Sequence, residues 1–352
     1  METSIVKGVG SDCMTVARAT TSCTAGAVAA ARYASLAGRR RAPAVRPAIV
    51  DRGRRASTAA GRVNAAPMGG VGPVEVITFD LDDTLWPTWP VVGAANQAFV
   101  DFCQKRIPGF PDCAGVNAYM KTIRKERKEA SEAKGERHYP LSYASLRIAG
   151  GYRAALACGF PEDDAIAVVS RGYHIAWIPT RGSEAERLLF DGVVEAFTKL
   201  RAQYPNAAIG SITNGLGSAA GAGLGEFFDF EISADALIDE MMVHEDDARK
   251  PSRFPFELAM KYAKEHATPW SGDPSRWVHV GDDLLNDCQA AKVHGFRTVH
   301  VEHPDVVPYE PGGGGSYPGD PAREEAKLDY DALVDAKVAS IRELPDVLAQ
   351  WD

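Results

Sequence analysis

The sequence has few cysteines, and their spacing fits neither a metal site nor a redox motif. Six are scattered over 352 residues, and no two of them form a Cys-x-x-Cys pair. Structural zinc sites and thiol–disulfide motifs are built from such pairs. Beyond residue 70 we therefore expect reduced thiols, mostly buried as small apolar side chains. These are Cys103, Cys113, Cys158 and Cys288.

Residues 1–70 have few acids and no apolar run long enough to span a bilayer. Eleven Lys and Arg face three acids, which gives the segment a net charge of +8, and Ala, Ser and Thr are abundant. This composition is typical of an organelle transit peptide. The stretch VNAA at 63–66 resembles a plastid processing site. We expect residues 1–70 to be a transit peptide and disordered linker leading to the plastid (chloroplast stroma). The mitochondrion, or a basic tail that stays attached, is the alternative.

Clustered positive charge is absent from the rest of the chain. The whole chain has a net charge of −8, so the residues after 70 carry −16. The one basic run, KTIRKERK at 121–128, sits among acids and is typical of the exposed face of a helix. Nucleic-acid binding needs clustered Lys and Arg. We expect neither a nucleic-acid nor a membrane partner.

Short apolar runs alternate with helical segments after residue 70. Runs this apolar fit the strands of a parallel sheet that helices cover on both faces. The pattern predicts an α/β fold with a doubly wound, mostly parallel sheet. The predicted strands are 74–79, 207–213, 228–232, 277–281 and 296–301, and the predicted helices are 190–203, 255–266 and 284–294, with a short strand and final helix in 339–348.

One interval breaks this alternation. Residues 90–188 show helical patterning without a convincing strand, and a crossover between parallel strands needs far fewer residues. We expect an inserted α-helical cap domain at 90–188, between the two parts of the α/β core at 71–89 and 189–352. The segment 304–323 is rich in Pro and Gly, which predicts a flexible loop within the core.

Polar residues follow the predicted strands where ligands bind in open α/β sheets, beyond the carboxyl ends. Carboxylates gathered in a partly dry site need a compensating cation. Oxygen ligands without nearby Cys or His favour a hard cation such as Mg²⁺. A hydroxyl and a lysine would contact a second anion, for which phosphate is the natural candidate. The four groups are Asp80, Asp82, Asp83 and Thr84; Thr213, Asn214 and Gly215; Lys250; and Asp282, Asp283 and Asp287.

These residues resemble, in order and spacing, the four motifs of the haloacid dehalogenase (HAD) superfamily. The motifs are DLDDT at 80–84, TN at 213–214, KP at 250–251 and GDD at 281–283 followed by Asp287. A single DxD pair is common by chance, but four motifs in register at strand ends are specific. The resemblance covers about residues 74–303 and the final helix. It implies an HAD-type Rossmann-like core, and a helical cap between motifs one and two is found in the phosphatase branch.

The resemblance also implies catalytic roles. Asp80 would be the nucleophile that forms an aspartyl-phosphate, and Asp82 the general acid and base. Mg²⁺ would be bound by the Asp80 carboxylate, the Asp82 backbone carbonyl and Asp282. Thr213 and Lys250 would hold the phosphoryl oxygens, and Asn214 would touch phosphate or substrate.

Three supporting residues complete the implied site. Thr84 would buttress Asp82, and Asp283 and Asp287 would orient the metal ligands and Lys250. The family usually has Ser or Thr at the position of Asp283. Its extra charge would either tighten metal binding or hydrogen-bond the loop, and the sequence leaves both interpretations open.

The leading functional hypothesis is a Mg²⁺-dependent phosphatase acting on a small phosphorylated metabolite, as a monomer or homodimer. One alternative is a hydrolytic 2-haloacid dehalogenase, a branch that lacks the second acid because a halide needs no proton. Another is a non-catalytic interaction protein on the same fold. Loss of Asp80, Asp82 or Lys250 would have indicated that, and all three are present.

Overall fold

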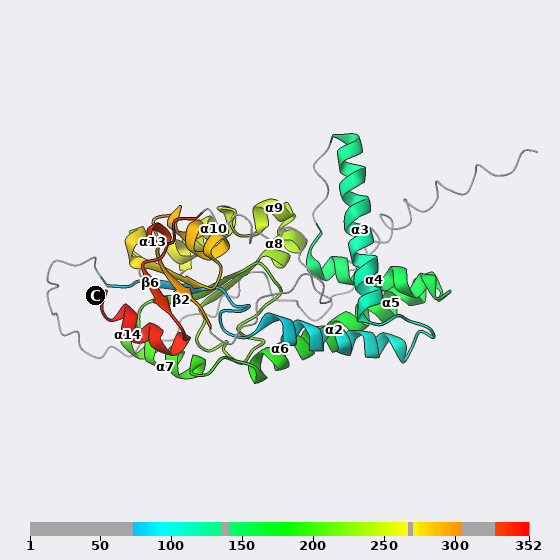
Figure 1. Cartoon of the computed structure of the whole chain (residues 1–352), viewed down its shortest axis with the longest axis horizontal. Helices are drawn as coiled ribbons and strands as arrows, with labels where there is room; N and C mark the ends of the chain where they lie inside the picture. The colour runs from blue at the N-terminus through cyan, green and yellow to red at the C-terminus, as the bar shows by residue number, and fades with distance from the viewer. Residues whose placement is uncertain (1–72, 136–140, 267–269, 304–327, 352) are drawn as a thin grey trace, which may run out of the picture. The chain divides into compact units, whose positions relative to one another are not determined.

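The computed structural model describes residues 73–135, 141–266, 270–303 and 328–351 (Figure 1). All of them belong to one compact unit, residues 46–352. The predicted transit peptide at 1–70 and the predicted loop at 304–323 lie outside the described residues. Within the described part of the chain, no helix combines the length and the apolar character that crossing a membrane would require.

The core is one six-stranded sheet in which every neighbouring pair is parallel. Its strand order is β3-β2-β1-β4-β5-β6. The chain thus builds outward from β1 in one direction and then, from β4, in the other. This reversal makes the edge beyond β1 and β4 the place where such sheets bind ligands. The strands are β1 (Val76–Phe79), β2 (Ala208–Thr213), β3 (Phe230–Ser233), β4 (Trp277–Gly281), β5 (Arg297–Val301) and β6 (Ala336–Val338).

The register brings the strand ends to the same level. Phe79 pairs with Ser211 of β2 and with Val280 of β4. The residues that follow these strands therefore emerge side by side at one edge of the sheet.

The predicted α/β class and parallel sheet are confirmed, and five predicted strands lie within two residues of their observed bounds. β1, β2 and β4 are buried along their whole length, as expected of strands covered on both faces. The placement of the last strand was wrong. It was predicted within 339–348, but β6 ends at Val338, and the segment after it forms a 3-10 turn and α14 (Leu344–Leu348).

Helices cover both faces of the sheet (Figure 1). On one face α7 (Val193–Gln203) and α14 pack against it, with the Phe79 and Phe197 rings 4.8 Å apart. On the other face α8 (Ala234–Met241) and α10 (Phe254–His266) pack against it. The remaining core helices are α9 (Glu245–Ala248), η2 (Pro274–Arg276), η3 (Leu284–Gln289), α11 (Ala290–Lys292), α13 (Tyr330–Leu333) and η4 (Ile341–Glu343).

The interval between β1 and β2 is helical, and its described residues contain no strand. The cap contacts the core near the start of α4, where the Ala144 N–H donates to Asp235 of α8 (3.0 Å) and the Ser142 hydroxyl donates to Asp239 (2.7 Å). The helices are α2 (Thr88–Gln104), α3 (Cys113–Lys134), α4 (Tyr143–Ala157), α5 (Glu162–Gly172), the π-helical turn η1 (Tyr173–Trp177) and α6 (Ile178–Arg187).

Candidate active site

The loop after β1 folds back on itself and keeps its acids at the sheet edge. The Asp80 N–H still bonds the Val280 carbonyl of β4 (2.8 Å), so Asp80 extends the sheet by one residue. Asp83 then adopts a positive φ of 60°, a conformation that Asp tolerates better than most side chains. Its N–H bonds the Trp86 carbonyl (2.8 Å) and closes the turn. The turn explains how closely spaced acids take up different positions around one site.

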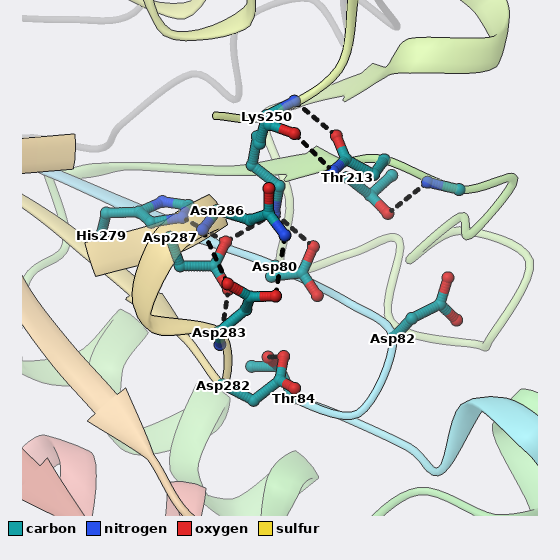
Figure 2. Close-up of polar contacts among 12 residues, drawn as sticks. Asp80, Asp82, Thr84, Thr213, Lys250, His279, Asp282, Asp283, Asn286 and Asp287 are labelled. Atoms are coloured by element: carbon teal, nitrogen blue, oxygen red, sulfur yellow. Dashed lines mark hydrogen bonds and ion pairs between the residues drawn. The ribbon is translucent and has the colours of Figure 1, made fainter. Parts of the chain in front are cut away.

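Lys250 is the cation at the centre of the site (Figure 2). Its Nζ lies 2.6 Å from Oδ1 of Asp80 and 2.6 Å from Oδ1 of Asp287. The residue is only 4% exposed. Burial lowers the pKa of the Lys250 ammonium, but the Asp287 and Asp80 carboxylates outweigh burial and raise the pKa above its ordinary value. Lys250 is therefore charged and bound to two carboxylates.

Asn214 fixes the backbone of Lys250. Its Oδ1 accepts from the Lys250 N–H (2.6 Å), and its Nδ2 donates to the Lys250 carbonyl (3.0 Å). Asn214 was predicted to bind phosphate or substrate. The structure shows its carboxamide bonded to the Lys250 backbone, and a contact between Asn214 and phosphate stays a prediction.

Asp287 is held from three sides. Besides Lys250, the His279 ring places Nε2 3.2 Å from Oδ1 of Asp287, and the Asp283 N–H donates to Oδ2 (3.1 Å). Burial on its own raises the pKa of the Asp287 carboxyl, but Lys250 and His279 overcome it and hold that pKa well below its usual range. The Asp287 side chain also packs closely against the backbone at the end of β4, since a Cβ on Gly281 would lie 2.2 Å from the Asp287 carboxyl carbon. The predicted role of Asp287 in orienting Lys250 agrees with this geometry.

His279 belongs to none of the four motifs but contacts Asp287. Its position inside β4 indicated a core histidine with a satisfied hydrogen bond, and the ring is indeed buried, with Nδ1 2.9 Å from the Thr78 hydroxyl. Its second nitrogen faces Asp287, a contact that depends on how the loop after β4 folds.

Three carboxylates form a group that could hold a metal ion. Asp80, Asp282 and Asp287 each offer an oxygen, and these oxygens lie within 4.8 Å of one another. Burial raises the pKa of Asp80 and of Asp282 well above the usual range. For Asp282 the neighbouring carboxylates raise the pKa as well. Among the described residues Asp282 has no cationic partner. A set of oxygen donors with uncompensated charge fits a hard divalent cation such as Mg²⁺.

Thr84 supports a different acid from the one predicted. It was expected to buttress Asp82, but its hydroxyl donates to Oδ1 of Asp282 (3.1 Å). The turn at Asp83 points Thr84 toward β4, which explains the difference. Thr84 therefore helps to place a candidate metal ligand.

The two interpretations of Asp283 are separated by its contacts. Its Oδ1 accepts from the N–H groups of Leu285 (2.9 Å) and Asn286 (2.7 Å), and its Oδ2 accepts from the Asn286 side chain (2.7 Å). Asp283 thus caps the first turn of η3 in the way Asp commonly caps helices. These contacts favour the interpretation that its charge hydrogen-bonds the loop.

Asp82 lies apart from the Lys250 group (Figure 2). Both its oxygens accept from Nη2 of Arg181 in α6 (2.9 and 2.8 Å), and Oδ1 also accepts from Nε1 of Trp86 (2.9 Å). Arg181 comes 99 residues after Asp82 and carries no motif, so the sequence offered no signal for it.

Thr213 reaches the same edge from β2. Its hydroxyl accepts from the Gly215 N–H (3.2 Å) and is not drawn into the Lys250 group. The structure thus brings Asp80, Lys250, Asp282 and Asp287 together, with Asp82 and Thr213 beside them. The role of each in a reaction stays a prediction at this point.

Comparisons with known proteins agree with this geometry. The profile of the haloacid dehalogenase-like hydrolases matches residues 74–295. The chain is 24% identical over 239 residues to the 5-amino-6-(5-phospho-D-ribitylamino)uracil phosphatase YigB of Escherichia coli strain K12, which covers 67% of this chain and 88% of that protein. It resembles the solved 2-haloacid dehalogenase of Pseudomonas syringae pv. Tomato DC3000 with a TM-score of 0.54 and 24% identity, over 79% of this chain and 100% of that chain. The structural likeness concerns the fold.

Proposed function

Because the chain belongs to the haloacid dehalogenase-like hydrolases, we propose that it is a Mg²⁺-dependent phosphatase that hydrolyses phosphomonoesters through a covalent intermediate on Asp80. The observation that supports this most is the buried Lys250 between Asp80 and Asp287, beside an Asp282 without a cationic partner among the described residues. Such a site combines a nucleophile, Asp80, with the Lys250 ammonium and a place for a metal ion beside Asp282. The similarity to YigB, a phosphatase by name, points in the same direction.

The proposed reaction has two steps. A carboxylate oxygen of Asp80 attacks phosphorus, and the bond from phosphorus to the leaving oxygen breaks. Asp82 gives its proton to that oxygen, so the product leaves as an alcohol. A water molecule then attacks phosphorus and gives a proton to Asp82, while the bond between Asp80 and phosphorus breaks. Phosphate is released, and both acids return to their starting states.

The surrounding residues would stabilise the transferring phosphoryl group. Lys250 and the Thr213 hydroxyl would donate hydrogen bonds to its oxygens. Asp80, Asp282 and the Asp82 backbone carbonyl would hold Mg²⁺, which supplies charge neutralisation when bound.

The presence of Asp82 favours phosphoryl transfer over dehalogenation. A departing alkoxide needs a proton, whereas a departing halide does not. In this chain Asp82 occupies the sheet edge beside the nucleophile and is held by Arg181 and Trp86.

Chelation is expected to abolish the activity. The purified full chain should hydrolyse p-nitrophenyl phosphate with Mg²⁺ and lose nearly all turnover in EDTA, because EDTA removes the metal ion that the carboxylates would hold. Turnover should return when Mg²⁺ is added in excess. Release of nitrophenolate measures this. Unchanged turnover in EDTA would contradict the metal requirement. Halide release from a 2-haloacid in EDTA, without phosphatase activity, would favour the dehalogenase.

The substrate is proposed to be a small metabolite. The helical cap meets the core where α4 contacts α8 and where Arg181 contacts Asp82, so it reaches the edge of the site. A cap in this place leaves room for a small leaving group and limits access of water. The compound in the name of YigB is a small phosphorylated metabolite, which supports the same class here.

A screen of phosphorylated compounds tests the substrate class. We expect turnover of one or a few low-molecular-weight phosphomonoesters, measured as phosphate release, and none of folded phosphoproteins. Turnover confined to phosphopeptides or phosphoproteins would overturn the argument from the cap.

We also propose import into the plastid, supported by the net charge of +8 in residues 1–70. Cleavage is expected near residues 65–68, so the native protein should begin there in a plastid fraction. N-terminal sequencing decides this. A native chain that still begins at Met1 in the cytosol would contradict it.

A further inference from the structure

We propose that Arg181 is a positioning residue that orients the carboxyl group of Asp82 for proton transfer to the leaving oxygen. The proposal rests on the proposed phosphatase function and deepens it. No motif includes Arg181, and it enters the site from the cap helix α6 rather than from a strand end.

The contact between the two residues is close and buried. Nη2 of Arg181 lies 2.9 and 2.8 Å from the two oxygens of Asp82. The Arg181 side chain is 6% exposed and the Asp82 side chain 16%. A buried ion pair is weak grounds for stability, because removing two charges from water offsets most of their attraction. Nε of Arg181 is also buried without a hydrogen-bond partner among the described residues, which adds a further cost. A pair that contributes little to stability is better explained by what it holds in place.

Arg181 is fixed to the core, although it belongs to a cap helix. At the next residue, a Cβ on Gly182 would lie 2.8 Å from the Gly221 carbonyl, so the two backbones touch. Ala185, one turn later in α6, is buried within the same apolar cluster as β1 and α7. Arg181 therefore projects from a part of α6 that is anchored to the loops after β2, close to the chemistry.

The opposite side of Asp82 is equally constrained. Trp86 Nε1 donates to Oδ1, and a Cβ on Gly215 would lie 2.7 Å from Oδ2. The carboxyl group is thus confined by an indole, a glycine backbone and a guanidinium. Of these three, only Arg181 contacts both oxygens by hydrogen bonds and so sets the rotation of the group.

This role matters for one chemical event. In the first step the proton of Asp82 moves to the leaving oxygen as the bond to phosphorus breaks and Asp80 forms its own. A misdirected Asp82 slows the departure of a weakly acidic alcohol most, and it slows a strongly acidic phenol such as p-nitrophenol least, because that phenolate leaves without a proton.

The test compares para-substituted phenyl phosphates of similar shape and graded leaving-group acidity. The quantity is kcat/KM, which reports steps up to the formation of the covalent intermediate. For Arg181→Met we expect a loss of about 10²-fold with the least acidic phenol, within the range of general acid catalysis. The loss with p-nitrophenyl phosphate should be much smaller. In Arg181→Met the dependence of kcat/KM on leaving-group acidity should become as steep as in Asp82→Asn. Arg181→Lys should recover part of the lost kcat/KM.

Arg187 provides the matched control. It lies in the same helix, is 64% exposed and forms an ion pair with Glu184, outside the site, so Arg187→Met should follow the wild type. If Arg181→Met does not fold, Arg181→Gln is judged by the same criterion. An equal loss for every phenol, an unchanged profile or a gain with poor leaving groups would overturn the proposal. A wild-type protein that hydrolyses none of the esters would instead refute the proposed function.

Discussion

Replacing Asp80 with asparagine is expected to lower kcat for p-nitrophenyl phosphate by at least about 10³-fold, because the amide cannot attack phosphorus. Steady-state release of nitrophenolate in Mg²⁺ measures the loss. Undiminished turnover would contradict the assignment of Asp80.

The variant should remain folded, which keeps the result interpretable. Burial raises the pKa of Asp80, so its ionised form is disfavoured in the metal-free fold at any pH above its ordinary pKa. A neutral amide of the same shape removes that penalty and leaves Lys250 with one ionised partner, Asp287, so we expect the variant to stay folded in EDTA. Asp101→Asn is the matched control, since Asp101 is exposed on α2 and its side chain accepts a hydrogen bond from Gln97 (2.7 Å), outside the site.

Replacing Lys250 with methionine is expected to impair both activity and stability. Asp80 and Asp287 would lose the ammonium that lies 2.6 Å from each of them. Removing one partner of a buried ion pair leaves unpaired charge and lowers the free energy of unfolding by about 3–5 kcal/mol. The transferring phosphoryl group would lose a donor as well, which is expected to reduce kcat/KM by about 10²-fold or more.

Urea unfolding in EDTA and ester hydrolysis in Mg²⁺ measure the two effects separately. Lys261→Met serves as the control, because Lys261 is exposed on α10, the helix that follows Lys250. A Lys250→Met protein with wild-type stability would show that Asp80 and Asp287 do not depend on the ammonium.

The gathering of the acids and the lysine could be predicted because it follows from strand ends. In a parallel sheet the residues after each strand meet at one edge. β1, β2 and β4 are apolar enough to be recognised, so Asp80, Thr213 and Asp282 could be placed together from the sequence. Lys250 and Asp287 were placed at the same edge, and the resemblance to the family motifs supplied their roles.

Partners that depend on loop geometry could not be predicted. The positive φ of Asp83 turns Thr84 toward Asp282, and no pattern of residue types reveals such a turn. The partner of Asn214 could not be predicted either, because the motif at 213–214 does not specify which group the Asn214 side chain binds. The structure shows that the amide binds Lys250.

Contacts between cap and core were the least accessible to sequence analysis. Helical periodicity predicted a cap, but it says nothing about which side chain of α6 reaches the core. Arg181 meets Asp82 across 99 residues, where Gly182 packs against Gly221 and Ala185 is buried in the core. β6 was placed too late in the chain for a different reason: its three residues are too few to show the periodicity of a strand.

The central claim is that phosphate passes through Asp80, and trapping the intermediate tests it most directly. The protein is mixed with p-nitrophenyl phosphate and Mg²⁺, quenched in acid within one turnover, and digested for mass spectrometry. Borohydride reduction of a parallel sample converts an acyl phosphate to an alcohol and marks its position. We expect phosphate on the peptide that contains Asp80 and reduction at Asp80 itself. Phosphate on another residue, or full turnover without any labelled peptide, would contradict the mechanism.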